Sequence, residues 1–194
     1  MKTKRVFLVH GWSGKPSDDW FPWIRKELET RGFEFISPEM PDTDYPRISA
    51  WVEKLKVTIG NLDKDTYFIG HSMGCQTIMR TIESLPGKEP CGGAVFVAGW
   101  IQMQKMPGLS LEEAEIVKPW IKGDVNFDKV KKRLGHSVAI FSDNDPFIPL
   151  SQDKLFKERL GSKTIIEHNK GHFRKEDGIE ELPVALQELL KVAK

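Results

Sequence analysis

Short apolar runs alternate with longer amphipathic segments along this chain. The runs are rich in β-branched and aromatic residues, and several are apolar throughout, which is typical of strands buried on both faces of a parallel sheet. Six strands are predicted, at residues 5–9, 34–37, 66–69, 94–98, 138–142 and 164–167.

The amphipathic segments between these runs have the apolar spacing of helices. Gly32 ends the first segment, Pro86 and Gly87 end the third, and Pro183 opens the last at a first-turn position. Helices are predicted at residues 19–31, 48–59, 76–85, 109–117, 127–134, 150–160 and 183–192. The alternation predicts an α/β fold, a three-layer α/β/α sandwich around a six-stranded, mostly parallel sheet.

The 194 residues are expected to form one domain, because a chain of this length can bury a single core. The one long interval between predicted strands covers residues 99–137. Since it has no linker composition, we interpret it as an insertion that forms a possible small cap.

Composition excludes several classes of function. The formal net charge is +1, with 29 Lys and Arg against 28 Asp and Glu, so nucleic acid is not an expected partner. The basic run at 129–133 is typical of a solvated helix face. No apolar stretch has membrane-spanning length, and the short run after the basic N-terminus is no signal-peptide core, so we expect no membrane association and a cytoplasmic location. Cys75 and Cys91 form neither a metal-ligand pattern nor a disulfide framework.

Ser72 stands in a turn that carries chemical information. The pentapeptide Gly70 to Gly74 has the pattern Gly-x-Ser-x-Gly and lies between a predicted strand and a predicted helix. Small flanking residues let the backbone turn sharply enough to project a serine hydroxyl. The N-terminus of the following helix would favour a developing oxyanion. We therefore predict that Ser72 is a nucleophile.

A glycine-containing loop, residues 10–14, follows the first strand. In an open α/β sheet this loop lies beside the loop after the third strand, where ligands bind. We expect the backbone N–H groups of Trp12 and Met73 to form an oxyanion hole. His10 and His71 are interpreted as structural residues.

A serine nucleophile needs a histidine base, which a carboxylate orients. The last two strands are followed by two candidates of each kind, Asp143 or Asp145, and His168 or His172. We favour Asp145, which lies farther from its strand end, and His172, to which Gly171 gives backbone freedom. A metal site built on the two histidines is not expected, because Gly171 argues against a helix there and no third ligand is evident. No cofactor is required.

Large apolar residues are candidates for the wall of a substrate pocket, with ordinary core packing as the alternative for each. Trp12 and Trp100 are the residues that we assign to substrate binding. The further candidates are Met103, Met106 and Trp120.

These motifs together resemble the α/β-hydrolase fold, and more narrowly the small serine hydrolase family typified by a retinoblastoma-binding protein. The resemblance spans nearly the whole chain. It rests on His10-Gly11, Pro38 to Asp42, Gly70 to Gly74, Pro119-Trp120, Asp145 to Pro149 and Gly171 to Phe173. It implies a triad of Ser72, Asp145 and His172 and a strand order of 2-1-3-4-5-6.

The Leu-x-Cys-x-Glu motif by which the family's namesake docks to its protein partner has no counterpart around Cys75 or Cys91, so binding to such a partner is not implied. The expected activity is cleavage of small to medium carboxylic esters, amides or thioesters through an acyl-enzyme on Ser72. A small molecule is thus the expected partner. The alternative hypothesis is a non-catalytic interaction protein on the same scaffold.

Overall fold

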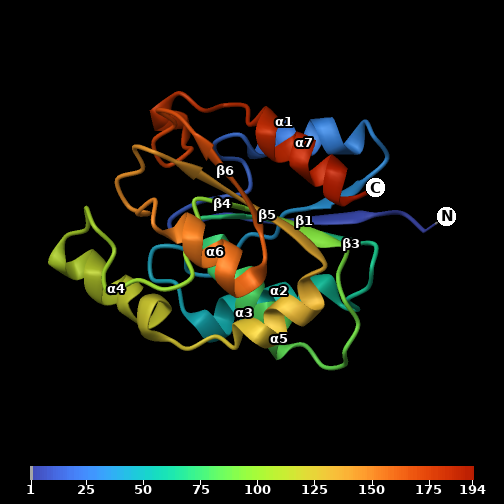
Figure 1. Cartoon of the computed structure of the whole chain (residues 1–194), viewed down its shortest axis with the longest axis horizontal. Coiled ribbons are helices and arrows are strands. Elements are labelled where there is room, and N and C mark those ends of the chain that lie inside the picture. Colours follow the sequence, from blue (N-terminus) through green and yellow to red (C-terminus); the bar gives the residue numbers. More distant parts are fainter. Residues whose placement is uncertain (1) are drawn as a thin grey trace.

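The computed structural model describes residues 2–194, and a twisted six-stranded sheet forms its centre (Figure 1). The strand order is β2-β1-β3-β4-β5-β6, and all neighbouring strands are parallel. This confirms the predicted order and extends the predicted parallel pairing to the entire sheet. The strands are β1 (Arg5–Val9), β2 (Glu34–Ile36), β3 (Thr66–His71), β4 (Gly93–Val97), β5 (His136–Ser142) and β6 (Lys163–Glu167).

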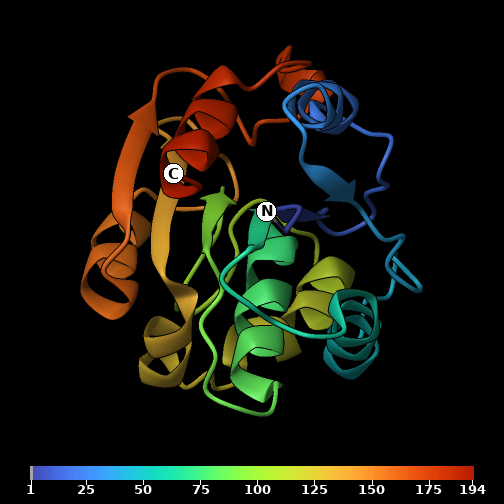
Figure 2. The same ribbon diagram turned by 90° about the vertical axis from the view of Figure 1, so that its right-hand side faces the viewer.

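Helices cover both faces of the sheet, as the α/β pattern predicts. Helices α1 and α7 lie together on one face, and α2, α3, α5 and α6 pack side by side on the other (Figure 2). None of the helices within residues 2–194 is both long enough and apolar enough to cross a membrane. The helices are α1 (Phe21–Glu29), α2 (Ile48–Ile59), α3 (Met73–Ser84), α4 (Leu111–Lys122), α5 (Phe127–Leu134), α6 (Gln152–Leu160), the short 3₁₀ helix η1 (Lys175–Asp177) and α7 (Pro183–Val192).

Helix α3 begins three residues earlier than predicted, directly after Ser72. The sequence pattern places its start at Gln76, because the Gly-x-Ser-x-Gly pattern indicates a turn of several residues between strand and helix. In the structure Ser72 alone makes the turn, with φ of 51° and ψ of −117°, and Met73 is already helical. The first N–H groups of α3 therefore lie next to the Ser72 side chain.

Helix α4 continues through Pro119, whereas the sequence predicts its end at Val117. Ser110 caps its first turn with Glu113 in a reciprocal capping box. Proline removes one helical hydrogen bond, but tertiary packing compensates. The buried Trp120 donates from its indole N–H to the Pro46 carbonyl at 2.9 Å and packs edge-on against Trp51 of α2.

The end of β1 and the start of α3 approach each other so closely that Gly74 is required between them. A Cβ atom at position 74 would lie 2.0 Å from the carbonyl oxygen of Val9 and 2.8 Å from that of His10. Both oxygens belong to backbone, which cannot move aside cheaply. This contact sets the spacing between the first loop and the Ser72 turn.

We therefore predict that Gly74→Ala lowers the free energy of unfolding by roughly 3 kcal/mol, since the new methyl group must push two packed backbone segments apart. Gly32→Ala is the matched control. A Cβ there meets no atom within 4 Å, and only its φ of 81° is unfavourable, at a cost of about 1 kcal/mol. Urea unfolding of both variants measures the difference. Equal losses would contradict the close-approach argument.

Candidate active site

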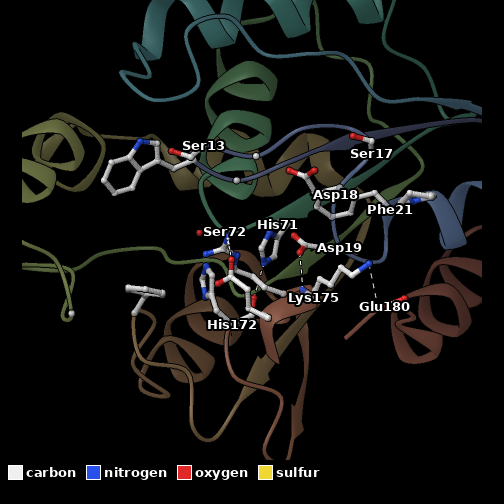
Figure 3. Close-up of a pocket in the computed structure, with 18 of the residues that line it drawn as sticks. Ser13, Ser17, Asp18, Asp19, Phe21, His71, Ser72, His172, Lys175 and Glu180 are labelled. Atoms are coloured by element: carbon white, nitrogen blue, oxygen red, sulfur yellow. Dashed lines mark hydrogen bonds and ion pairs between the residues drawn. The ribbon is translucent and has the colours of Figure 1, made fainter. Parts of the chain in front are cut away.

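Ser72 stands at the carboxyl edge of the sheet in a strained turn. Its positive φ is unfavourable for a residue with a side chain, and only tight packing around the turn maintains it. A Cβ at Gly70 would come within 2.9 Å of the Cys75 backbone, so this glycine allows the helix to fold back on the strand. Ser72 lines a cavity at this edge of the sheet (Figure 3).

The loop after β1 packs directly against Ser72. A Cβ at Gly11 would lie 3.2 Å from the Ser72 Cβ. Trp12 lines the cavity and is held by its indole N–H, which donates to the Asp44 carbonyl at 2.9 Å. Within the described chain, the backbone N–H groups of Trp12 and Met73 have no protein acceptor. Both groups are thus free to donate to a ligand oxygen beside Ser72.

His10 fixes the shape of this loop. Its Nε2 accepts from the Met40 N–H at 3.2 Å, so Nδ1 carries the proton and donates to the Gly11 carbonyl at 2.8 Å. Burial lowers the pKa of His10. The residue is a neutral structural link, in agreement with its sequence interpretation.

His172 and Asp145 form a buried pair across the loops that follow β6 and β5. The His172 Nδ1 lies 2.8 Å from Asp145 Oδ2, and the two side chains are 8% and 2% exposed. The other carboxylate oxygen of Asp145 accepts from the backbone N–H groups of Phe147 and Ile148 at 2.9 and 3.0 Å. Asp145 therefore directs the protonated Nδ1 of His172 toward itself and leaves Nε2 available as a base.

The two loops are connected by a series of hydrogen bonds that the sequence analysis did not identify. Consecutive side chains at the end of β5 accept from consecutive N–H groups after β6, which fixes the loop that carries His172. The pairs are Ser142 with Lys170 at 3.0 Å, Asp143 with Asn169 at 2.9 Å and Asn144 with Gly171 at 2.8 Å. The run of short polar side chains in 142–145 is the signal that could have indicated it.

Asp177 of η1 also holds the loop that carries His172. Its Oδ2 accepts from the His172 N–H at 2.8 Å and from the Arg174 N–H at 3.0 Å. A Cβ at Gly171 would lie only 2.1 Å from the Asp177 carboxylate, and Gly171 has a φ of 53°. Because Gly171 has no side chain, the loop can approach the Asp177 carboxylate closely.

The alternative pair, His168 and Asp143, lies away from this cavity. The His168 Nδ1 is 2.5 Å from Asp143 Oδ2, but the His168 side chain is 80% exposed and does not line the cavity. The Asn169 N–H bond, followed by the contact with His168, lowers the pKa of Asp143. The geometry brings His172 and Asp145, and not this pair, to the side of Ser72.

Ser72 and His172 line the same cavity and are drawn close together in Figure 3. The Ser72 hydroxyl makes no hydrogen bond to a described residue in this structure. A nucleophile and its base are often this loosely arranged until substrate is bound.

The cavity has a volume of about 1000 Å³ and a mixed lining. Its apolar lining residues are Trp12, Phe21, Pro22, Trp23, Met106, Leu109 and Phe147. Its charged lining residues are Asp18, Asp19, Glu113, Arg174, Lys175, Glu176, Glu180 and Glu181.

Trp100, which the sequence analysis assigned to substrate binding, lies elsewhere. Its side chain is buried, its carbonyl accepts from Gln76 at 2.7 Å, and it is absent from the cavity lining. Trp120 is also a core residue, and Met103 packs against the core without reaching the cavity. Of the predicted wall residues, Trp12 and Met106 line it.

The interval 99–137 contributes one short stretch to the cavity. Helix α5 packs against α3 and α6 within the helical layer. Only Met106, Gly108, Leu109 and Glu113 of this interval line the cavity. The small cap stays a prediction, and the part of this interval that lines the cavity is the loop before α4 together with the first turn of α4.

A second buried histidine, His71, lies beside His172. The His71 Nε2 is 2.8 Å from the His172 carbonyl, which can only accept, so Nε2 carries the proton. Burial, reinforced by the nearby His172 charge, lowers the pKa of His71 to about 3.

This shift predicts a specific loss of stability in acid. In the unfolded chain His71 binds a proton near pH 6.5, whereas folded His71 does so only near pH 3. The unfolded state therefore binds more protons in this window, so the free energy of unfolding falls as the pH decreases from 6.5 toward 3. His71 contributes at most about a few kcal/mol to this decrease in the free energy of unfolding.

Chemical unfolding at several pH values measures the contribution of His71 to the pH dependence of stability. We expect the stability of His71→Gln to fall less between pH 6.5 and 4 than that of the wild type. Because only the pH slope is compared, a constant cost of the substitution does not matter. An unchanged slope would mean that His71 is not buried in neutral form.

Described residues offer no group of three or more His, Cys, Asp or Glu side chains that could hold a metal ion. What the arrangement offers chemically is a hydroxyl and an imidazole, oriented by a carboxylate, on one cavity, together with the N–H groups of Trp12 and Met73, which have no protein acceptor. These are the groups that acyl transfer requires.

Comparisons with known proteins agree with this chemistry. The chain is 28% identical over 182 residues to the protein YdeN of Bacillus subtilis, covering 94% of this chain and 92% of that one. It is 27% identical over 176 residues to the serine hydrolase RBBP9 of Rattus norvegicus, covering 89% of this chain and 88% of the relative.

Solved structures show the same fold. The crystal structure of the B. subtilis ydeN gene product superimposes with a TM-score of 0.88 over 98% of both chains, at 27% identity. A carboxylesterase structure from Nitrososphaera gargenis gives a TM-score of 0.74, covering 99% of this chain and 91% of the other. At 15% identity, that second likeness shows the α/β-hydrolase fold alone.

The model of the serine hydrolase family matches residues 6–191, nearly the whole chain. Together with the hydrolase relatives, this match identifies an enzyme and sets aside the alternative of a non-catalytic scaffold. The chain belongs to the serine hydrolase family.

Proposed function

We propose that this hydrolase cleaves small to medium carboxylic esters through an acyl-enzyme on Ser72, with amides and thioesters as the alternative bond types. The observation that carries the proposal is the buried 2.8 Å pair of His172 and Asp145 on the cavity that Ser72 also lines. A base oriented in this way converts a serine hydroxyl into an effective nucleophile.

In the acylation step, Ser72 Oγ attacks the carbonyl carbon of the substrate while His172 Nε2 accepts the hydroxyl proton. The N–H groups of Trp12 and Met73 donate to the oxyanion of the tetrahedral intermediate. The intermediate then collapses as the bond from carbon to the leaving oxygen breaks. The leaving alcohol takes the proton from His172.

In the deacylation step, water attacks the carbonyl carbon of the acylated Ser72 and gives a proton to His172. The second intermediate expels the Ser72 oxygen, which recovers that proton, and a carboxylic acid is released. Asp145 stabilises the imidazolium in both steps without taking up its proton.

The chemistry of the cavity favours short or polar acyl groups over long-chain lipids. Eight of the 23 lining residues are charged, and the apolar ones are Trp12, Phe21, Pro22, Trp23, Met106, Leu109 and Phe147. A long acyl chain requires a continuous apolar channel, and charged side chains in the lining disfavour such a chain. Trp12 therefore stays in the proposed substrate site, and Trp100 does not. The cytoplasmic location and the small-molecule partner stay predictions from the sequence.

Turnover of p-nitrophenyl esters from acetate to laurate tests the reaction and the acyl length together. We expect kcat/KM to be highest for acetate to hexanoate, because longer chains would have to contact charged side chains. Ser72→Ala should reduce hydrolysis to the background rate. An optimum at laurate would contradict the size assignment, and full activity of Ser72→Ala would contradict the mechanism.

Two matched substitutions distinguish the roles of Asp145 and Asp143 in catalysis. Asp145→Asn should lower kcat by roughly a thousandfold or more, because the amide no longer stabilises the imidazolium and favours the wrong tautomer of His172. Asp143→Asn should lower kcat by no more than about fivefold, because it changes an exposed pair and keeps the oxygen that accepts from Asn169. Steady-state kinetics on p-nitrophenyl acetate give both values. The reverse order would assign the triad to Asp143.

A further inference from the structure

His71, the residue before Ser72, is buried between three parts of the proposed catalytic machinery. Its side chain lies at the end of β3, and a Cβ at Gly11 of the first loop would come within 3.5 Å of its Nδ1. Its ring centroid is 5.0 Å from that of His172. Figure 3 shows the two rings beside Ser72 at the same cavity.

The contacts of His71 are directed at backbone, not at the reacting atoms. Its Nε2–H donates to the carbonyl of His172 at 2.8 Å. The indole N–H of the buried Trp20 donates to the next carbonyl, that of Phe173, at 3.1 Å. Two consecutive carbonyls of the base loop are thus held by two buried side-chain donors.

The base loop needs such anchors, because its backbone is strained directly after His172. Phe173 has a φ of 58°, whereas the φ of 53° before His172 belongs to Gly171, which adopts it without strain. A positive φ costs a non-glycine residue about 1–2 kcal/mol, so this conformation persists only if its surroundings hold it. Phe173 itself is buried.

His71 is also kept uncharged, and the aromatic rings of Trp20 and Phe21 enclose it edge-on. Its low pKa, caused chiefly by burial, means that it stays neutral while His172 gains and loses a proton. A neutral donor at this place does not repel the imidazolium that forms during acyl transfer.

We propose that His71 is a positioning residue for the general base: its Nε2–H bond to the His172 carbonyl holds the imidazole within reach of Ser72. The proposal rests on the proposed function of Ser72 and His172. His71 itself has no role as a base, because its Nε2 is occupied by this bond.

Glutamine and methionine at position 71 form a matched pair for the test. The Gln side-chain amide can place an N–H donor near the position of the histidine Nε2, whereas Met has a similar length and volume without a donor. Met therefore leaves the buried His172 carbonyl unsatisfied and frees the loop. Thermal unfolding of both variants shows whether each is folded.

We expect His71→Met to lower kcat on p-nitrophenyl acetate by about 10- to 100-fold, with KM within about twofold, since a small displacement of the base slows the chemical step. His71→Gln should retain most of the wild-type kcat. Wild-type kcat in His71→Met, or an equal loss in both folded variants, would overturn the proposal.

A second measurement separates this proposal from the proposed function. In the Ser72→Ala background, hydrogen exchange of the amides at 171–173 should be faster with Met at position 71 than with Gln. If the wild type proves inactive but this difference is seen, the anchor holds and the proposed function fails. If exchange is equal in both variants, the anchor is wrong, whatever the activity.

Should His71→Met fail to fold, ¹⁵N NMR of the wild-type imidazoles decides. We expect His71 to be protonated at Nε2 only and to show no titration between pH 5 and 8. A proton at Nδ1, or a titration near pH 6.5, would overturn the proposal.

Discussion

The hydrogen bonds between the turn after β5 and the loop after β6 are the interactions on which the proposed site depends most. Parallel strands bring the two segments to the same edge of the sheet, but neither segment has regular structure of its own. Ser142, Asp143 and Asn144 accept from consecutive N–H groups of the base loop. Asp145 then meets the His172 imidazole. One short polar run therefore sets both the path of the loop and the orientation of the base.

A close backbone contact likewise fixes the rest of the proposed site, which is the first loop and the turn at Ser72. Gly74 allows α3 to begin against the carbonyl of Val9, and this places the free N–H groups of the first loop and of α3 around Ser72. The strained φ of Ser72 is a consequence of joining β3 and α3 through a single residue. Rigid packing replaces the flexibility that a longer turn would have, which is what a preorganised oxyanion site requires.

Sequence reasoning predicted the strands and the Ser72 turn from local signals along the chain, and the family resemblance that the motifs carry implied the sheet order. Apolar runs identify strands, and glycine spacing identifies the Ser72 turn. The start of α3 was misplaced, because a glycine-rich pentapeptide does not reveal that one serine makes the whole turn. The end of α4 was misplaced, because packing of Trp120 outweighs the local effect of Pro119.

Features that depend on contacts between residues far apart in the sequence could not be predicted from the sequence pattern. Trp100 has the size and apolar character of a pocket residue, yet it is buried in the core, and its carbonyl accepts from Gln76 of α3, 24 positions away. The bond from His71 to the His172 carbonyl joins residues 101 positions apart. The sequence favoured Asp145 over Asp143, but the contact with His172 that supports this choice joins residues 27 positions apart.

The central claim is that Ser72 is activated as a nucleophile by His172 in the folded protein. Reaction with a fluorophosphonate, followed by mass spectrometry of the peptides, tests it most directly. The account predicts a single phosphonylated residue, Ser72, whose labelling slows by orders of magnitude in His172→Gln. Labelling at another residue, or a rate unaffected by His172→Gln, would contradict it.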